Sequence, residues 1–200
     1  MEAGLLLLLG GYLLGAVPFG LLIGWARGVD VRRLGSGNIG ATNVLRVVGK
    51  AEAAGTLLLD GVKGAAPVLL ARALTLGDGW AAAAGLAAFL GHCFPVFLRF
   101  RGGKGVATAL GAVLAALPVV GLTALAVWLA TALCFRYSSL AALAAAVSLP
   151  VTTAVREGGG PSLALTLLLA ALIVVRHHAN IRRLWRGEEQ KIGQRAAPAG

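Results

Sequence analysis

Residues 5–26 read LLLLLGGYLLGAVPFGLLIGWA, without one charged side chain. About 20 apolar residues are enough for a helix to cross the hydrocarbon core of a bilayer. The residues before this run include one acid, Glu2, and no base, whereas a cleavable signal peptide begins with basic residues. We therefore expect residues 5–26 to form a retained first transmembrane helix.

The composition of the whole chain agrees with a protein that lies in lipid. Hydrophobic residues make up 58% of the 200 residues and charged residues only 13%, about half of the ~25% that soluble domains carry. Cys93 and Cys134 lie in apolar stretches, without CxxC or metal-type histidine spacing. We expect two buried reduced thiols, with neither a disulfide nor a metal site.

Further apolar stretches follow the first along the chain, and their lengths suit membrane-spanning helices. The expected spans are residues 5–26, 53–74, 80–98, 106–117, 119–135, 140–155 and 162–175. The fourth is short and meets the fifth at a tight turn. The sequence thus predicts an all-α polytopic membrane protein of one domain, with about seven transmembrane helices and a tail over residues 176–200.

The loop charges predict the orientation of these spans. With seven spans, fifteen of the 18 lysines and arginines fall on the side of the tail, Arg72 and Arg156 fall on the other side, and Lys63 lies inside a span. Because cytoplasmic loops are rich in Lys and Arg, we expect the N-terminus outside and the C-terminus in the cytoplasm. The net charge of +10 does not indicate a nucleic-acid partner, since the basic residues stand in short clusters between apolar runs. They suit an anionic membrane surface or small phosphorylated ligands.

Four polar segments on the expected cytoplasmic side hold most of the unusual chemistry: residues 35–50, 60–64, 91–111 and 176–193. The first begins GSGNIGATNVLR at Gly35 and contains GxGxxG. A dinucleotide fingerprint needs a strand before this motif, and here a transmembrane helix precedes it. Glycines followed by a helix still let backbone N–H groups approach an anion. The candidate ligands for phosphate here are Ser36, Gly37, Asn38, Thr42, Asn43 and Arg46.

The third segment contains RFRGGKGVAT from Arg99 to Thr108. It is not a nucleoside-triphosphate loop, because Leu98 replaces the first glycine of that motif and Gly105 replaces its hydroxyl residue. A lysine between glycines directly before a helix still offers N–H donors and a point charge to phosphate. We predict an anion site at Gly102, Gly103, Lys104 and Gly105. His92, just upstream, is expected to be a structural hydrogen-bonding residue.

Ionisable residues also stand within or next to the spans. Asp60 and Lys63 lie three residues apart on one helix face, which favours an ion pair. Such a pair inside lipid either shapes a site or holds the bundle together, and the sequence leaves both readings open. His177 and Asn180 share the same spacing where the last span ends. His178 adjoins His177, but consecutive side chains do not share a helix face, so we expect no metal there.

Together, the runs GSGNIGATNVLR, DGVKG, GHCFPVFLRFRGGKGVAT and RHHANIRRL…GEEQK resemble the bacterial acyl-phosphate:glycerol-3-phosphate acyltransferase family in order and spacing. The resemblance covers most of the chain. It implies an enzyme of the bacterial inner membrane whose site faces the cytoplasm. The implied reaction transfers a fatty acyl group from acyl-phosphate to glycerol-3-phosphate and gives lysophosphatidic acid. It implies no cofactor, and the soluble enzyme that makes acyl-phosphate is a possible partner.

The resemblance also assigns roles to residues. The first family motif falls on Ser36, Asn38, Asn43 and Arg46, the phosphate loop on residues 102–105, and the third motif on His177, Asn180 and Glu189. His178 stands where a basic residue is expected. Ala142 stands where relatives often carry serine, which leaves Ser139 as the nearest hydroxyl for substrate.

The expected mechanism is direct transfer, because the chain has neither a GxSxG elbow nor an HxxxxD dyad. Lys104, Arg46, Arg183 and the loop amides would neutralise the phosphates. His177 could accept the proton of the attacking hydroxyl as a general base, or the donor phosphate could take it. The main alternative function is a small membrane transporter of an organic phosphate. A transporter site lies near the bilayer midplane, often between repeats, whereas these polar residues gather at one interface.

Overall fold

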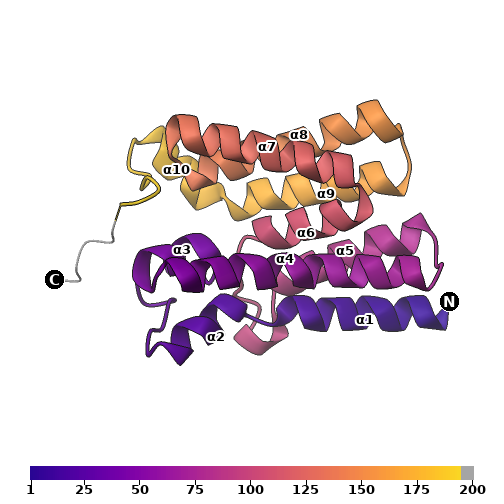
Figure 1. Ribbon diagram of the computed structural model, residues 1–200, viewed down its shortest axis with the longest axis horizontal. Coiled ribbons are helices and arrows are strands. Elements are labelled where there is room, and N and C mark those ends of the chain that lie inside the picture. Colours follow the sequence, from indigo (N-terminus) through magenta and orange to yellow (C-terminus); the bar gives the residue numbers. More distant parts are fainter. Residues whose placement is uncertain (195–200) are drawn as a thin grey trace.

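The computed structural model describes residues 1–194, and within them the regular structure is helical throughout (Figure 1). The all-α prediction is confirmed. The last six residues of the predicted tail 176–200 lie outside the described residues. The elements in chain order are α1 (Glu2–Ala16), α2 (Phe19–Ala26), α3 (Ala41–Val47), α4 (Lys50–Ala73), α5 (Asp78–Cys93), η1 (Val96–Leu98), α6 (Val106–Ala116), α7 (Pro118–Phe135), α8 (Ser138–Glu157), α9 (Pro161–Arg176) and α10 (His178–Trp185).

Five helical segments in residues 1–194 are long and apolar enough to cross a membrane. They are Glu2–Ala26, Lys50–Ala73, Asp78–Leu98, Pro118–Phe135 and Ser138–Glu157. The pair α9 and α10, bent by 58°, makes a sixth if it is counted as one span. The expected fourth span is the shorter apolar helix α6, of 11 residues. The count of seven and the orientation therefore stay predictions.

Prolines interrupt the helix in two of the expected spans, although each still forms one segment long enough to cross a membrane. The expected helix 5–26 consists of α1 and α2, because Pro18 has no N–H and holds Val17 in an extended conformation. The expected helix 80–98 stops at Cys93, before Pro95, and continues only as the short helix η1. Both breaks lie near the middle of the bundle's length, at a similar level (Figure 1).

The helices cross closely where glycines meet a neighbouring backbone. A Cβ atom on Gly15 of α1 would collide with the Ala88 carbonyl of α5, and one on Gly64 of α4 would collide with the Thr108 carbonyl of α6. Small residues allow such approach in lipid, where burial between helices gives little drive for association. The expectation of two buried thiols holds for Cys93 only, because Cys134 on α7 is exposed.

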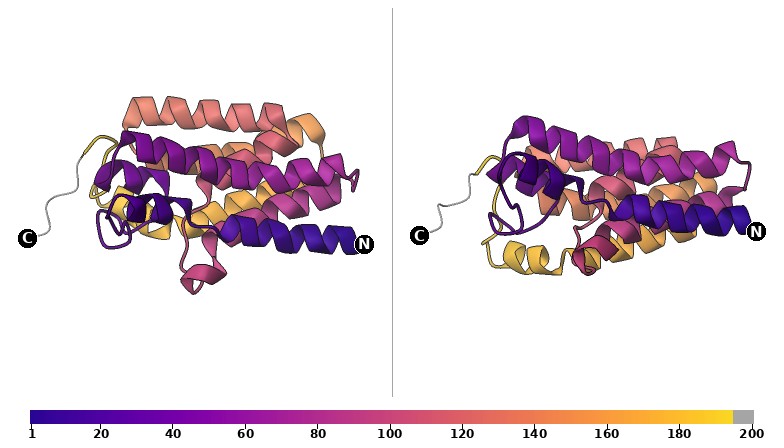
Figure 2. Two further views of the ribbon diagram at one scale, coloured as in Figure 1. Left: turned by 60° about the horizontal axis from the view of Figure 1, so that its bottom comes forward. Right: turned by 90° about the horizontal axis from the view of Figure 1, so that it is seen from below.

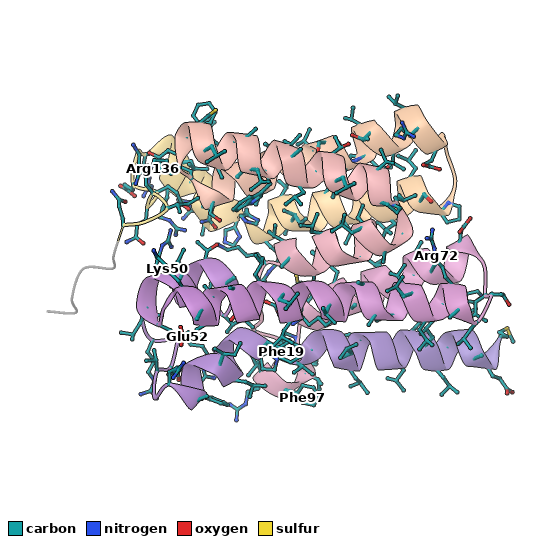
Figure 3. The ribbon with its side chains drawn as sticks, viewed as in Figure 1. Phe19, Lys50, Glu52, Arg72, Phe97 and Arg136 are labelled. Carbon is teal, nitrogen blue, oxygen red and sulfur yellow. The ribbon has the colours of Figure 1, made fainter. Side chains whose placement is uncertain are left out.

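The two ends of the bundle differ. The N-terminus lies at one end, next to the short α4–α5 and α8–α9 connections, whereas α2, α3 and α10 gather at the other end, where the C-terminal tail leaves (Figures 1 and 2). The labelled side chains mark the same division: Lys50, Glu52 and Arg136 lie at the tail end and Arg72 at the opposite end (Figure 3). Two of the four predicted polar segments, residues 35–50 and 176–193, therefore lie at the tail end, and Lys104 of a third contacts Asn180 there.

Candidate active site

A chain of hydrogen bonds joins the glycine-rich loop, α10 and the tail. Lys104 Nζ donates to Asn180 Oδ1 at 2.6 Å. Asn180 Nδ2 in turn donates to Glu189 Oε1 at 2.6 Å. The amide of Asn180 is buried. Its oxygen contacts a cation and its nitrogen contacts an anion, so the orientation of the amide is fixed. The structure thus brings three predicted site residues together from segments 76 and 9 positions apart.

Glu189 is the anion at the centre of this cluster, and its side chain is only 6% exposed. Ser139 Oγ, at the start of α8, donates to Oε1 at 2.7 Å, and Arg183 Nε donates to Oε2 at 2.6 Å. Burial acts to raise the pKa of Glu189, but the hydrogen bonds from Ser139, Asn180 and Arg183 together lower it below its usual value. Glu189 is therefore a carboxylate at neutral pH.

The loop that carries Lys104 is tied to its surroundings mainly through its backbone. The N–H groups of Gly102 and Gly103 donate to the carbonyls of Cys93 and His92, at 3.2 and 3.1 Å. Arg176, at the end of α9, donates to the carbonyls of Gly102 and Gly103 at 2.9 Å. The amides of these two glycines are thus already used, which corrects the expectation that they offer donors to phosphate. Within residues 1–194 the N–H groups of Lys104 and Gly105 make no backbone hydrogen bond, and those of the first turn of α6 have no intrahelical acceptor.

Gly105 and Lys104 complete the loop. Gly105 has φ +76°, a conformation that side chains disfavour, and a Cβ there would collide with the Phe89 ring. This tight fit places Lys104 directly before α6. Burial lowers the pKa of Lys104 to about 8, and Arg183, Arg46 and Arg176 act in the same sense, whereas Glu189 opposes them. The ammonium is therefore charged at neutral pH.

Arg46 approaches the same cluster from α3. Its Nη2 donates to the Gln190 carbonyl at 3.2 Å, so α3 contacts the tail one residue after Glu189. Its Nε is buried and has no hydrogen-bond partner within residues 1–194. Burial lowers the pKa of Arg46, although an arginine stays charged over the physiological range. An anionic ligand could accept a hydrogen bond from this unpaired Nε–H group.

The first glycine-rich motif forms an exposed loop before α3. The Asn43 side chain is fully engaged in holding it: Oδ1 accepts from the Ser36 N–H at 2.8 Å, and Nδ2 donates to the carbonyls of Val31 and Leu34. Asn38 Oδ1 accepts from the Gly40 N–H at 3.0 Å. These contacts give Asn43 and Asn38 a role in shaping the loop. Ser36 and Gly37 are exposed, and no hydrogen bond within the described chain links them to Lys104 or Glu189.

Thr42 connects this motif to α8. Its Oγ1 lies 3.0 Å from Ser138 Oγ, the residue next to Ser139. The sequence did not single out Ser138, nor Arg176, whose contacts to the glycine-rich loop are described above. Both adjoin predicted site residues. For Arg176 the available signal in the sequence was its position directly after the last apolar run. Ala142 is buried on α8.

His177 is buried at the bend between α9 and α10. Its Nδ1 lies 2.8 Å from the Ile173 carbonyl, which can only accept, so Nδ1 carries the proton. Nε2 of the neutral ring is then free to accept a proton. His178 is exposed, and its Nδ1 contacts the Val175 carbonyl at 3.0 Å. The two adjacent histidines thus differ in their surroundings, since His177 is buried and His178 is exposed.

The second polar segment lies deeper in the bundle. Lys63 Nζ lies 2.8 Å from Asp60 Oδ1, so the predicted ion pair is present, and both side chains are almost fully buried. His92 Nδ1 lies 3.6 Å from the same oxygen. His92 stands between this pair and Gly103, since a Cβ on Gly103 would collide with His92 Nε2.

The arrangement as a whole is a cationic site at one end of a membrane bundle. Lys104, Arg46 and Arg183 surround one carboxylate, so the cluster keeps an excess of positive charge. Two hollows lie elsewhere: one of about 510 Å³ beside α7, lined by Trp128, Leu133, Arg136 and Ile192 among others, and one of about 520 Å³ between α1 and α4. The hollow beside α7 includes Ile192 of the tail, three residues after Glu189. The charged cluster is the better candidate for an anion site, because it gathers Lys104, Arg46 and Arg183, whereas the first hollow has one cation, Arg136, and the second has none.

Comparisons with known proteins agree with this picture. The family model described as "Glycerol-3-phosphate acyltransferase" matches residues 5–187. The glycerol-3-phosphate acyltransferase of Geotalea daltonii is 50% identical over 189 residues, which cover 94% of this chain and 97% of that protein. That of Thioalkalivibrio sulfidiphilus is 56% identical over 190 residues, 94% of each chain.

Two crystal structures of PlsY, an integral membrane glycerol 3-phosphate acyltransferase, share the fold. The glycerol 3-phosphate form superposes with a TM-score of 0.92 at 43% sequence identity, and covers 96% of both chains. The lysophosphatidic acid form gives a TM-score of 0.89 at 42% identity, again over 96% of both chains. The protein described here is therefore a member of the glycerol-3-phosphate acyltransferase family.

Proposed function

We propose that this chain transfers a fatty acyl group from acyl-phosphate to glycerol-3-phosphate, and releases lysophosphatidic acid and inorganic phosphate. The observation that carries the proposal is the convergence of Lys104, Arg46 and Arg183 on one buried cluster at a single end of a membrane bundle. The relatives' activity and the two PlsY forms, with glycerol 3-phosphate and with lysophosphatidic acid, support the acceptor and the product. An apolar bundle with an anion site suits these two reactants, because both carry a phosphate and the acyl donor also carries a long apolar chain.

The cationic residues supply electrostatic stabilisation in this scheme. Two phosphates and a developing oxyanion must be neutralised, and each well-placed donor contributes about 3 kcal/mol. Lys104 and Arg183 bring charge from the loop and α10. Arg46, whose Nε has no hydrogen-bond partner within residues 1–194, contacts the Gln190 carbonyl next to Glu189. Holding two reactants side by side contributes up to about 7–11 kcal/mol more. Ser36, Gly37 and Thr42 are proposed to complete the substrate contacts from the first motif.

The chemical step is attack by a hydroxyl oxygen of glycerol-3-phosphate on the acyl carbon. A new ester C–O bond forms, the bond from the acyl carbon to the phosphate oxygen breaks, and phosphate leaves with the bonding electrons. His177 Nε2 accepts the hydroxyl proton in one route, in which Asn180 fixes the geometry beside it. In the other route the departing phosphate takes the proton. The fixed tautomer of His177 leaves Nε2 as the acceptor that the first route requires, and the His177→Ala variant separates the two routes.

The proposed location is the bacterial inner membrane, with the charged cluster in the cytoplasm. The support is the excess of Lys and Arg at that end and the apolar surface of the spanning helices. The acyl chain then lies among the helices, while the phosphates stay at the interface. A soluble enzyme that makes acyl-phosphate is the proposed partner, since its product must reach this face.

The test is acyl transfer by the purified protein in detergent. Palmitoyl phosphate and glycerol-3-phosphate are supplied together, and palmitoyl coenzyme A replaces palmitoyl phosphate in the control. We expect lysophosphatidic acid to form with the phosphate donor only. Product from the coenzyme A thioester at a similar rate would overturn the proposed donor, and no product from either would overturn the proposed reaction.

A further inference from the structure

The buried ion pair of α4 contacts the break between α1 and α2. Lys63 Nζ lies 2.8 Å from Asp60 Oδ1 and also donates to the Val17 carbonyl at 2.8 Å. Its ammonium lies 5.5 Å from the centre of the Phe19 ring. Val17 precedes Pro18, where the helix is interrupted, and its carbonyl also accepts from the Phe19 N–H at 3.1 Å. Lys63 is a second donor to this carbonyl, and Asp60 balances its charge.

Asp60 has a second neighbour that the ion pair does not explain. Its Oδ1 lies 3.6 Å from His92 Nδ1. Both atoms are buried. His92 Nδ1 has no hydrogen-bond partner within residues 1–194, whereas Asp60 Oδ1 has only the ion pair with Lys63, which does not have hydrogen-bond geometry. Leaving a buried N–H unpaired costs about 1–3 kcal/mol, and a shift of about 0.4 Å would bring His92 Nδ1 and Asp60 Oδ1 within hydrogen-bond range. Asp60 is therefore the candidate acceptor for His92.

His92 in turn supports the glycine-rich loop. Its carbonyl accepts from the Gly103 N–H at 3.1 Å. Its ring lies directly against Gly103, since a Cβ on Gly103 would collide with Nε2. The backbone and the ring of His92 thus both contact Gly103. Lys104 directly follows Gly103 in the chain. A rotation of the ring would move the loop that aims the ammonium.

We propose that Asp60 and His92 are positioning residues for the phosphate loop, with Lys63 as the group that holds Asp60 in place. Asp60 fixes the His92 ring, the ring supports Gly103, and Gly103 sets the direction of Lys104. The inference rests on the proposed function of that loop. It assigns the intramembrane ion pair to the site, whereas a pair that only held the bundle together would be replaced by apolar residues without loss of substrate binding.

Two double variants separate positioning from helix packing. Asp60→Asn with Lys63→Met removes both charges but keeps a side-chain oxygen that accepts from His92. Asp60→Leu with Lys63→Met removes both charges and the acceptor. Neither variant leaves one buried charge unpaired, and both lose the bond to Val17 equally. The only difference between them is the acceptor for His92.

The KM values for glycerol-3-phosphate and palmitoyl phosphate are measured for both variants, beside the unfolding temperature in detergent. We expect Asp60→Leu/Lys63→Met to raise KM for at least one substrate about tenfold over Asp60→Asn/Lys63→Met, at a similar unfolding temperature, because small misplacements of a binding group are costly. Equal KM values for both substrates would overturn the inference.

A further variant keeps the test decisive if the leucine variant does not fold. His92→Phe keeps a ring against Gly103 but cannot donate to Asp60, and we expect the same rise in KM, with His92→Gln closer to the parent. Unchanged KM in His92→Phe would overturn the inference. If the parent protein itself transfers no acyl group, the proposed function fails instead, and the variants are then compared by how far inorganic phosphate raises their unfolding temperatures.

Discussion

Lys104 and Glu189 carry opposite charges and both contact Asn180, yet they form no direct ion pair in the described part of the chain. Glu189 is instead paired with Arg183, and the ammonium of Lys104 contacts only a neutral amide oxygen. An ion pair would have to be broken before a phosphate could bind, whereas this amide contact costs less to exchange. The arrangement keeps a buried positive charge ready for an anion.

Lys104→Ala is expected to raise KM for the phosphate substrates about 10- to 100-fold, because a hydrogen bond to a charged group contributes about 1.5–3 kcal/mol. Steady-state kinetics with each substrate varied in turn measure the effect. Lys50→Ala is the matched control, since Lys50 is exposed at the start of α4. Unchanged KM values in Lys104→Ala would contradict the assignment.

The pKa of Lys104, lowered by burial to about 8, predicts a limit on the alkaline side. Below this pH the ammonium is protonated and binds phosphate, and above it the charged fraction falls about tenfold per unit. We expect kcat/KM to decline above about pH 8, since this ratio reports the free enzyme. Lys104→Arg stays charged and should lose the decline. A profile that is the same in both proteins would count against Lys104.

His177→Ala is expected to lower kcat by about 10²- to 10⁴-fold, the usual contribution of a general base. His178→Ala is the control on the adjacent residue, and we expect it to be near the parent because that ring is exposed. The pH dependence of kcat is recorded for both. A modest loss in His177→Ala with an unchanged pH profile would favour proton transfer to the donor phosphate.

At this scale the sequence predicted which residues gather but not what each one contacts. The spacing of His177 and Asn180 and the glycines around Lys104 identified groups that the structure brings to one end. Asn43 looked equally polar, but its amide holds its own loop, because the exposed turn before α3 leaves backbone groups that need partners. The role of Arg176 depends on contacts to residues more than 70 positions away, which no local pattern encodes.

At the scale of the elements, the helices keep their places through glycine contacts. Gly15→Ala on α1 is expected to destabilise the protein by about 1–3 kcal/mol, because the added methyl meets the backbone of Ala88. Gly10→Ala, on the same helix, meets no other atom within 4 Å and should not destabilise it. Unfolding temperatures in detergent compare the two. Equal effects would contradict the close α1–α5 crossing.

Helix positions were largely predictable, since apolar runs of this length have few alternatives in lipid. The helix ends were less so. Pro18 was visible in the sequence, yet the run around it is uniformly apolar and carries no polar residue to mark an interruption. At the break the Val17 carbonyl accepts from the Phe19 N–H and from the distant Lys63, and no local pattern reveals the second donor. Pro95 likewise interrupts an apolar run, since α5 ends at Cys93 and only the short helix η1 follows. The chain then enters the glycine-rich loop.

At the scale of the molecule, the bundle has one end where α2, α3 and α10 gather and an opposite end of short connections (Figures 1 and 3). Charged residues from α3, the loop before α6, α10 and the tail meet at the first end. This division suits an enzyme that takes its acyl chain from the bilayer and its phosphates from water. The central claim is that these segments share one membrane face, and that this face is cytoplasmic.

Side-specific labelling of single cysteines tests this claim most directly. In a protein with Cys93→Ala and Cys134→Ala, cysteine is placed at the exposed positions Ser36, Arg101 and Gln190 of the charged end, and at Asp78 and Glu157 of the other. We predict that a membrane-impermeant thiol reagent labels Asp78→Cys and Glu157→Cys in cells whose inner membrane is intact, and the other three only after that membrane is permeabilised. Labelling of Ser36→Cys and Gln190→Cys from opposite sides would contradict the account.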